Sequence, residues 1–408
     1  MKILMIAPEP FFEPRGTPFS EYFRIKALSE LGHEIDLATY PIGKDVEIPK
    51  LRIFRSMKVP FIHKVKVGPS FQKLLLDFFL FFKVLKLLFK NRYDAMHTHE
   101  EACFFGAVLS RLWRIPHVYD MHSSLAQQFI NFNVTHSPFI HRILRFFEKR
   151  ALLSSDAIIA ICPYLGDHVR ESGVTRKVFV IENTPEADMF FNHSSANKSD
   201  VELPAEIKTR PVVLYAGTFE HYQGLDLLME SIPSVIKVLP ETVFLLIGGD
   251  KNTIEQFRKR SVELGVEKNV ILKEKVPVEQ VNGYLDIAKV LVSPRKSGTN
   301  TPLKIYSYLR SGRPIVATNL ITHTQVLNPE IAILTQPEPE AFAKGIIDAL
   351  TNPEMSKMVE RAQQIAEEKY SYREYLAKIS NLYSYVRNLK DGLKESSIHE
   401  PNQKSLQL

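Results

Sequence analysis

The sequence predicts an α/β protein made of two domains, each built on a parallel sheet. The chain has 408 residues, which is long enough for two domains that each bury a core. Short apolar runs alternate with helical patterns in both halves, as is typical of parallel sheets covered by helices. Between the halves, residues 192–210 are polar and lack periodicity, so we interpret them as a linker.

The predicted strands are short apolar runs bounded by turn residues. In the first half they lie near residues 2–7, 34–39, 51–55, 94–98, 116–120, 157–161 and 178–182. In the second half they lie near residues 211–216, 243–248, 269–273, 289–293, 314–318 and 331–334. This order predicts a first domain over residues 1–195 and a second domain over residues 205–370.

The C-terminal part of the chain has a long helical pattern over residues 353–389, which is broken near Tyr370. We therefore expect residues 371–389 to form a separate helix. The chain becomes polar after this point, and residues 390–408 are predicted to be a disordered tail.

The cysteine content and the N-terminal sequence favour an intracellular protein. Two cysteines in 408 residues argue against a disulfide framework and suit a reducing cytosol. The first apolar run, Lys2 to Ala7, is interrupted too soon by Pro8 and Pro10 to be a signal peptide. We therefore expect a cytoplasmic protein.

Positive charge is concentrated in one part of the first half. The net charge of the chain is +6, but residues 51–150 hold sixteen Lys and Arg against six Asp and Glu. Such asymmetry predicts that this domain has an anionic partner. The candidates are a membrane surface, a nucleic acid and a charged substrate.

The segment from Phe71 to Lys90 is the most apolar in the chain. Charged residues interrupt it, and it is too short to span a bilayer. Lys83, Lys86 and Lys90 fall at helical spacing on one face, while apolar residues occupy most other sides. Either the helix is wedged between other elements, or part of it contacts an anionic membrane or the acceptor at the inner face of the cell membrane. A nucleic acid is not expected, because the basic residues flank aliphatic runs rather than exposed aromatic side chains.

Residues 291–319 combine a strand end, a basic loop and a short helix. The loop carries Arg295 and Gly298, and Thr301 is a good N-cap with Pro302 at the first helical position. A helix that opens from such a loop directs free N–H groups and the positive end of its dipole at the adjacent crevice, which favours a phosphate. The alternative is an ordinary βαβ turn that binds nothing.

Gly16 lies between the first strand and the first helix. It either permits a close backbone approach to a ligand or is a simple turn glycine. Neither half contains GxGxxG between a strand and a helix, so a dinucleotide site is not expected. Parallel sheets bind ligands at the carboxyl ends of their strands, and both Gly16 and the 295–304 loop fall at such ends.

Histidines follow two of the predicted strands. His97 and His99 lie on one face of a strand and are followed by two glutamates. No third group of ligands is evident in the sequence, so we expect no metal site. His122 follows the next buried strand and Asp120. It is either a satisfied loop histidine or a group that acts in the crevice.

Residues 294–298 and 311–318 read Pro-x-x-x-Gly and, after a short helix, x-Gly-x-Pro-Ile-Val-Ala-Thr. This pattern resembles the donor-site signature of the retaining glycosyltransferases of family 4, which have the GT-B fold. Further matches in the family's order are residues 1–39, 93–99, 118–122, 156–159, 180–183 and 212–226. The resemblance covers about residues 1–385.

The resemblance implies two Rossmann-like domains facing across a cleft, with the last helix crossing back to the first domain. It implies a hexosyl-type transferase that moves a sugar from a UDP- or GDP-linked donor to a lipid-linked or cell-envelope glycan, with retention and without a further cofactor. The donor would lie against the second domain and the acceptor against the first. Catalytic roles fall on His122 and Asp120, because a histidine at this place in the family lies beside the donor sugar.

The donor positions that the resemblance implies depart from the family where charge is needed. They are Gly16, Gly217, Thr218, Gln223, Arg295, Gly298, Asn300, Thr301, Lys304 and Ser307. Thr218 and Gln223 stand where the family has the Arg and Lys that grip the diphosphate. Thr299 or Asn300, together with Ser307, stands where it has two glutamates.

Arg295 and Lys304 are the nearest cations that could replace the missing pair, because a transferase must neutralise its leaving diphosphate. Lys304 falls in the first turn of a predicted helix, where a cation is unfavourable unless an anion binds. The departures leave two alternatives open. One is a nucleotide-sugar epimerase of the same fold, and the other is a catalytically degenerate binding or scaffold subunit.

Overall fold

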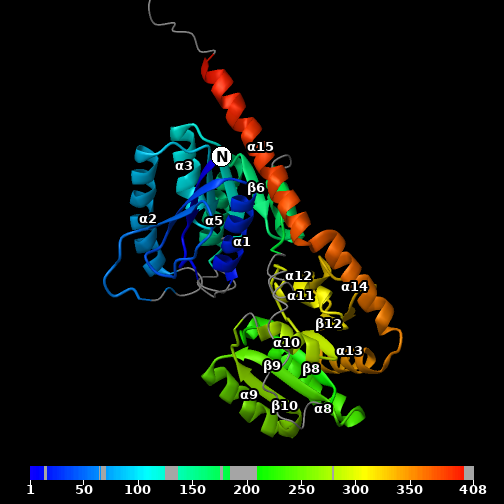
Figure 1. The fold of residues 1–408 in the computed structure, drawn as a ribbon. Helices are drawn as coiled ribbons and strands as arrows, with labels where there is room; N and C mark the ends of the chain where they lie inside the picture. The colour runs from blue at the N-terminus through cyan, green and yellow to red at the C-terminus, as the bar shows by residue number, and fades with distance from the viewer. Residues whose placement is uncertain are drawn as a thin grey trace, which may run out of the picture. The chain divides into compact units, whose positions relative to one another are not determined.

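The computed structural model describes residues 1–12, 16–63, 65, 70–124, 137–174, 178–183, 209–277 and 280–398. The chain splits into two compact units (Figure 1), which are Met1–Glu182 with Tyr375–Leu408, and Asn183–Glu374. Each unit contains one parallel sheet, so the predicted fold class of two Rossmann-like domains is confirmed. Apart from its last two residues, the predicted linker lies outside the described part of the chain.

The first unit is built on a seven-stranded sheet in the order β3-β2-β1-β4-β5-β6-β7, in which all neighbours are parallel. Its strands are β1 (Lys2–Ala7), β2 (Glu34–Thr39), β3 (Leu51–Arg55), β4 (Ala95–His99), β5 (His117–Met121), β6 (Ala157–Ala160) and β7 (Val178–Val180). Every strand predicted for this half is present. The strand order reverses between β1 and β4, and open parallel sheets bind ligands at the carboxyl side of such a point.

The helices described between these strands cover the sheet. They are α1 (Gly16–Glu30), α2 (Phe71–Lys90), α3 (Ala102–Trp113), α5 (Pro138–Ser154) and α6 (Pro163–Glu171). In α2, Leu76, Leu80 and Val84 are buried in the same core cluster as Leu4 and Ile6 of the sheet. Because these positions recur every four residues, α2 buries one face only.

The last helix, α15 (Tyr372–Ile398), belongs from Tyr375 onward to the first unit. Its Lys378 Nζ donates to Glu182 Oε2 at 2.6 Å, and its Lys390 Nζ donates to the Tyr93 carbonyl at 3.3 Å. The predicted return of this helix to the first domain is therefore confirmed. The predicted break near Tyr370 is also confirmed, because α14 (Met355–Tyr370) ends there.

The start of the predicted disordered tail is wrong. The helix continues through Ile398, beyond the expected end near residue 389. Lys390 is anchored to the first unit by its bond to Tyr93, which favours continuation of the helix over the polar sequence that follows. Residues 399–408 lie outside the described part of the chain.

The second unit is built on a six-stranded parallel sheet in the order β10-β9-β8-β11-β12-β13. Its strands are β8 (Val212–Ala216), β9 (Val243–Gly249), β10 (Val270–Glu274), β11 (Val290–Ser293), β12 (Ile315–Thr318) and β13 (Ile333–Thr335). All six strands predicted for this half are present. Here the order reverses between β8 and β11, which marks the expected ligand edge of this sheet.

Helices cover both faces of the second sheet. They are α8 (Leu225–Val238), α9 (Lys251–Glu263), α10 (Val281–Ile287), α11 (Lys304–Arg310), α12 (Ile321–Thr324), α13 (Pro339–Thr351) and α14, with short 3₁₀ turns η3 (His221–Gln223) and η4 (Glu267–Asn269). Val213 packs with α8 and α13, whereas its neighbour Leu214 packs with α10, α11 and α14. Strands buried on both faces explain the continuous apolar runs. Among the described residues, no helix has the length and apolarity needed to cross a bilayer.

Candidate functional site

Several of the predicted donor-side residues meet at the carboxyl end of β8. A Cβ on Gly217 would lie 2.6 Å from Lys304 Nζ, so a glycine is needed for the lysine to come this close. The same Nζ lies 3.8 Å from the centroid of the Tyr215 ring. The structure therefore brings the end of β8 together with the first residue of α11, as the prediction required.

The basic side chains of Lys304 and Arg295 lie together, with Lys304 Nζ and Arg295 Nε both buried. Among the described residues, no hydrogen-bond partner reaches Lys304 Nζ or Arg295 Nε. Burial, and next the charge of Arg295, lower the pKa of Lys304 well below its ordinary value. Burial also lowers the pKa of Arg295, whose guanidinium carbon lies 5.0 Å from the centroid of the Tyr222 ring. Two basic groups are thus held together, and no acid that the structure describes is paired with them.

The loop that carries Arg295 is fixed by buried hydrogen bonds that the sequence did not reveal. Thr318 Oγ1, at the end of β12, donates to the Arg295 carbonyl at 2.6 Å. His323 lies 2.8 Å from the Thr318 carbonyl and 2.9 Å from Ser293 Oγ through its two ring nitrogens. Burial lowers the pKa of His323 to about 3, so its imidazole is neutral. The arrangement holds the loop without neutralising the cations.

Some of the other predicted donor positions have unbonded side-chain oxygens, and others present a backbone carbonyl. Gln223, Thr301 and Ser307 each have a buried side-chain oxygen without a hydrogen-bond partner among the described residues. Asn300 presents its carbonyl, which accepts from Arg295 at 2.7 Å, and Thr299 accepts from Gln325 at 2.8 Å in the same way. A ligand that carries hydroxyl groups would supply the missing hydrogen bonds of such buried polar atoms at the carboxyl edge of the sheet.

Three further donor positions have backbone features rather than side-chain contacts. The carbonyl of Thr218 accepts the Tyr215 hydroxyl at 2.7 Å. Gly298 has a φ of 110°, which favours glycine. Gly16 is the first residue of α1, and its immediate neighbours, residues 13–15, lie outside the described part of the chain.

The predicted start of the helix at Thr301 and Pro302 is wrong. α11 begins at Lys304, and Thr301 Oγ1 makes no capping bond. The amides of Ile305 and Tyr306 instead bond the carbonyls three residues earlier, at 3.0 and 3.2 Å. This tighter first turn satisfies those amides without a side-chain cap. The predicted stop is confirmed, because Gly312 follows the helix with a φ of 71°.

In the first unit, polar side chains from β4, β5 and α1 form a buried cluster. Arg24 Nε donates to Asp120 Oδ2 at 2.9 Å. His122 Nε2 lies 3.5 Å from Asp120 Oδ1 and 3.2 Å from His99 Nδ1. His97 Nδ1 lies 2.7 Å from the hydroxyl of Tyr383, on α15. The predicted pair of His122 and Asp120 is thus brought together.

The sequence could not reveal two members of this cluster. Arg24 and Asp120 are 96 residues apart, and His97 and Tyr383 are 286 residues apart. No local pattern in the sequence connects residues at such separations, so only the fold shows these contacts.

The charges of this cluster are balanced. Burial alone would raise the pKa of Asp120, but Arg24 and the nearby histidines hold it well below its ordinary value. Burial lowers the pKa of His122 to about 4, and it lowers the pKa of His97 and His99 as well. One ion pair surrounded by neutral imidazoles is therefore the expected state at neutral pH.

His97, His99 and Asp120 also have the spacing of metal ligands, since one ligand atom of each lies within 4.8 Å of the others. The sequence had indicated the two histidines with Glu100 and Glu101, and not Asp120. Arg24 already holds one oxygen of Asp120, and a divalent ion beside this buried guanidinium would be repelled. The cluster is better explained as a hydrogen-bonded ion pair, and the absence of a metal stays a prediction.

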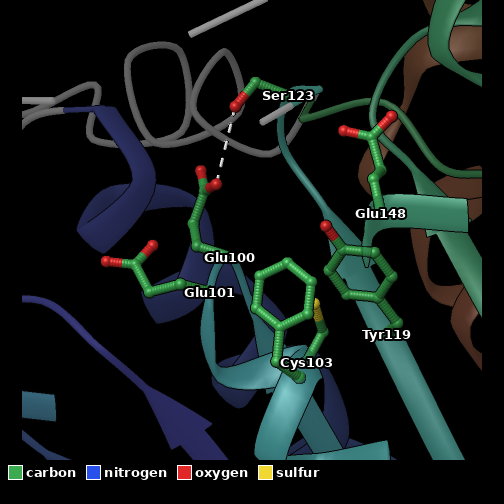
Figure 2. Close-up of a pocket in the computed structure, with 7 residues that line it drawn as sticks. Glu100, Glu101, Cys103, Tyr119, Ser123 and Glu148 are labelled. Atoms are coloured by element: carbon green, nitrogen blue, oxygen red, sulfur yellow. Dashed lines mark hydrogen bonds between the residues drawn. The ribbon is translucent and has the colours of Figure 1, made fainter. Parts of the chain in front are cut away.

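A small acidic pocket lies beside this cluster, with room for about one water molecule. Its lining residues are Glu100, Glu101, Cys103, Phe104, Tyr119, Ser123 and Glu148. Figure 2 shows Ser123 facing Glu100, to which its hydroxyl donates at 3.5 Å. Glu148 accepts from Ser124 at 2.8 Å, and Lys73 Nζ lies 3.1 Å from Glu101. Each of the three glutamates that line the pocket therefore has a partner within the first unit.

The outer face of α2 is apolar and exposed. Phe71 is 83% exposed, Phe89 is 78% exposed, and Leu74 is 66% exposed. Lys86 and Lys90 are exposed, and Lys83 is half-buried. A helix wedged between other elements would bury such side chains, so that alternative is wrong. α5 has a similar set of exposed apolar side chains, which are Phe139, Ile140, Ile143, Phe146 and Phe147.

Comparison with known proteins agrees with this architecture. Residues 24–185 match the model of Glycosyltransferase Family 4, and residues 199–368 match the model of Glycosyl transferases group 1. The phosphatidyl-myo-inositol mannosyltransferase of Mycobacterium tuberculosis is 22% identical over 400 residues, which cover 95% of this chain and 97% of that protein.

Two solved structures show a similar fold over nearly the whole chain. The sucrose-phosphate synthase of Thermosynechococcus elongatus has a TM-score of 0.74 at 18% identity, covering 94% of this chain and 98% of that one. The HepE protein of Anabaena, solved in complex with UDP, has a TM-score of 0.69 at 17% identity, covering 94% of this chain and 100% of that one. Together with the two matching family models, these likenesses lead to one conclusion: this chain is a glycosyltransferase of family 4 with the GT-B fold.

Proposed function

We propose that this enzyme transfers a hexosyl group from a UDP- or GDP-linked sugar to a lipid-linked or cell-envelope glycan, with retention at the anomeric carbon. The observation that carries the proposal is the pair of adjacent basic side chains without an acidic partner, Lys304 and Arg295, at the carboxyl edge of the second sheet. Solved neighbours of the same fold include a protein in complex with UDP, which supports a nucleotide at this edge.

A diphosphate would supply the negative charge that Lys304 and Arg295 lack. Buried charges are strongly unfavourable without a counterion, and no carboxylate of the described residues is paired with Lys304 or Arg295. A leaving diphosphate gains negative charge during transfer, and preorganised cations stabilise it. We therefore assign to Lys304 and Arg295 the work that Thr218 and Gln223, which are uncharged, cannot do.

His122 is proposed to act beside the donor sugar. Its imidazole is neutral at physiological pH, so one ring nitrogen can accept a hydrogen bond and the other can donate one. Asp120 and His99 both lie near Nε2, which fixes the orientation of the ring. A fixed neutral imidazole suits the positioning of a sugar hydroxyl at the reacting centre.

The transfer reaction is tested by incubating the protein with labelled UDP- and GDP-sugars, with and without membranes. Label appearing in a lipid or glycan fraction, or released as free sugar, supports a transferase. An isomerised donor would indicate the epimerase, and binding without turnover would indicate the scaffold subunit. Neither alternative is favoured by the family to which the chain belongs.

We also propose that the first domain contacts the anionic inner face of the cell membrane through α2. The exposed phenylalanines provide apolar insertion, and Lys83, Lys86 and Lys90 add about 1 kcal/mol each near an anionic surface. The M. tuberculosis relative is named for a phosphatidylinositol acceptor, which supports a lipid-linked acceptor here.

Sedimentation with liposomes tests this contact. The wild type is expected to bind anionic vesicles more than neutral ones, and the triple variant Lys83→Glu/Lys86→Glu/Lys90→Glu to lose this preference. Salt should weaken binding without abolishing it, because apolar burial is not screened. If the triple variant binds as well as the wild type, α2 is not the contact surface.

A further inference from the structure

Lys304 combines burial with the lack of an acceptor. Its Nζ is buried, and within the described ranges no hydrogen-bond partner reaches it. It rests 3.8 Å from the centroid of the Tyr215 ring and against Gly217, which leaves no space for a side chain between them. An ammonium group in this position has lost its hydration and gained only the face of an aromatic ring in return.

The titratable groups around Lys304 offer no negative charge at neutral pH. They are Tyr215 from β8, Arg295 from the loop after β11, Tyr308 from α11 itself and His323 from α12. Burial raises the pKa of both tyrosines, and the pKa of His323 is about 3, so all three are neutral. Arg295 is a cation and lowers the pKa of Lys304 further, after burial. Burial and Arg295 therefore favour the uncharged amine, and only the face of the Tyr215 ring favours the ammonium.

We propose that Lys304 is uncharged in the free enzyme and takes up a proton when the diphosphate of the donor binds beside it. This inference rests on the proposed donor site and adds the chemistry of binding at that site. The proton comes from solvent and ends on Nζ, where the phosphate oxygens then accept its hydrogen bonds. The empty site holds the charge of Arg295 alone, and the occupied site holds two cations against the diphosphate.

Proton uptake gives donor binding a characteristic pH dependence. Between the pKa of Lys304 in the free enzyme and its higher pKa in the complex, the affinity for the donor falls as the pH rises, by up to about tenfold per pH unit. Arginine stays charged at all accessible pH values, so Lys304→Arg removes this dependence. Lys304→Met has no charge to gain, so it binds more weakly and without proton uptake.

Calorimetry with UDP as the probe, repeated with GDP, measures the proton exchange directly. Titrations near pH 8, where the UDP phosphates are fully ionised, are compared among buffers of different ionisation enthalpy. The wild type is expected to take up close to one proton per UDP, and Lys304→Arg to take up none. Lys296→Ala is the matched control, because Lys296 lies on the same loop but is already paired with Asp226.

The outcomes separate this inference from the proposed function. If the wild type binds UDP or GDP without proton uptake, or if Lys304→Arg takes up as much as the wild type, Lys304 is charged at rest and the inference is overturned while the donor site stands. If neither nucleotide binds to the wild type at any pH, the donor site and the inference fall together.

Discussion

The two domains treat buried charge in opposite ways. In the first, Arg24 is bonded to Asp120, and the surrounding histidines are neutral. In the second, Arg295 and Lys304 lie together, and no carboxylate that the structure describes pairs with them. A matched pair stabilises the domain around it, whereas two adjacent basic groups without an acidic partner are unfavourable as cations until an anion binds. We therefore interpret the first cluster as a support for His122 and the second as the proposed ligand site.

Arg24→Met should break the first cluster, because it leaves Asp120 buried without its counterion. We expect the free energy of unfolding to fall by about 3–5 kcal/mol. Trp113 is the only tryptophan and lies in the first unit, so its fluorescence during urea unfolding follows that unit. Arg170→Met is the control, since it removes an exposed pair with Asp167 in the same unit. Equal losses in the two variants would contradict a special role for the buried pair.

His122→Ala separates chemistry from support within the first cluster. Turnover should fall about a hundredfold or more, because the group that we propose to act beside the donor sugar is lost. Stability should change little by comparison with Arg24→Met, since the bond between Arg24 and Asp120 remains. Donor turnover and urea unfolding are measured on the same preparation. A variant with normal turnover would show that His122 is a structural histidine.

Arg295→Ala and Lys304→Ala test the role of the second cluster in nucleotide binding. Either change should weaken UDP or GDP binding by about 1.5–3 kcal/mol, as expected for a lost charge-assisted hydrogen bond. Neither should destabilise the fold as Arg24→Met does, because no buried carboxylate is left without its counterion. Calorimetry gives the affinities, with Lys296→Ala as the control. Unchanged affinity in both variants would remove these residues from the donor site.

Mild acid should affect the first domain through its buried histidines. Burial lowers the pKa of His122 to about 4 and that of His117 to about 3, whereas the unfolded chain has the ordinary value near 6.5. The unfolded state then binds more protons, so stability falls as the pH drops below about 6.5. Each histidine should contribute about 1 kcal/mol between pH 6 and pH 5. Glu21 and Asp77 have raised pKa values and act in the opposite direction, so the net slope of the wild type does not isolate the histidines. Urea unfolding followed by Trp113 fluorescence should therefore show a smaller loss of stability on acidification in His117→Gln than in the wild type, and equal losses would contradict the contribution of His117.

The sequence by itself determined the strands, their division into two halves and the candidates for the donor loop. Apolar runs of four to seven residues, such as Val243–Gly249, are local signals, because a strand buried on both faces needs an apolar side chain at nearly every position. Arg295 was found from its place after a predicted strand, whereas Gly217 and Lys304 followed from the resemblance to family 4. The exact start of α11 was not, because Thr301 is a good N-cap in sequence but makes no capping bond.

Only the tertiary structure decided how the charges are partnered. Arg24 meets Asp120 across 96 residues, and Tyr383 meets His97 across 286 residues, so no window of sequence contains either pair. The sequence also did not reveal how α12 holds the Arg295 loop. His323 of this helix contacts Thr318 and also Ser293, which lies 30 residues away in the sequence. Residue types and their spacing show which groups can carry charge. Whether a buried charge is balanced depends on which distant segments the fold places beside it. In this protein that difference distinguishes the bonded cluster of the first domain from the proposed ligand site of the second.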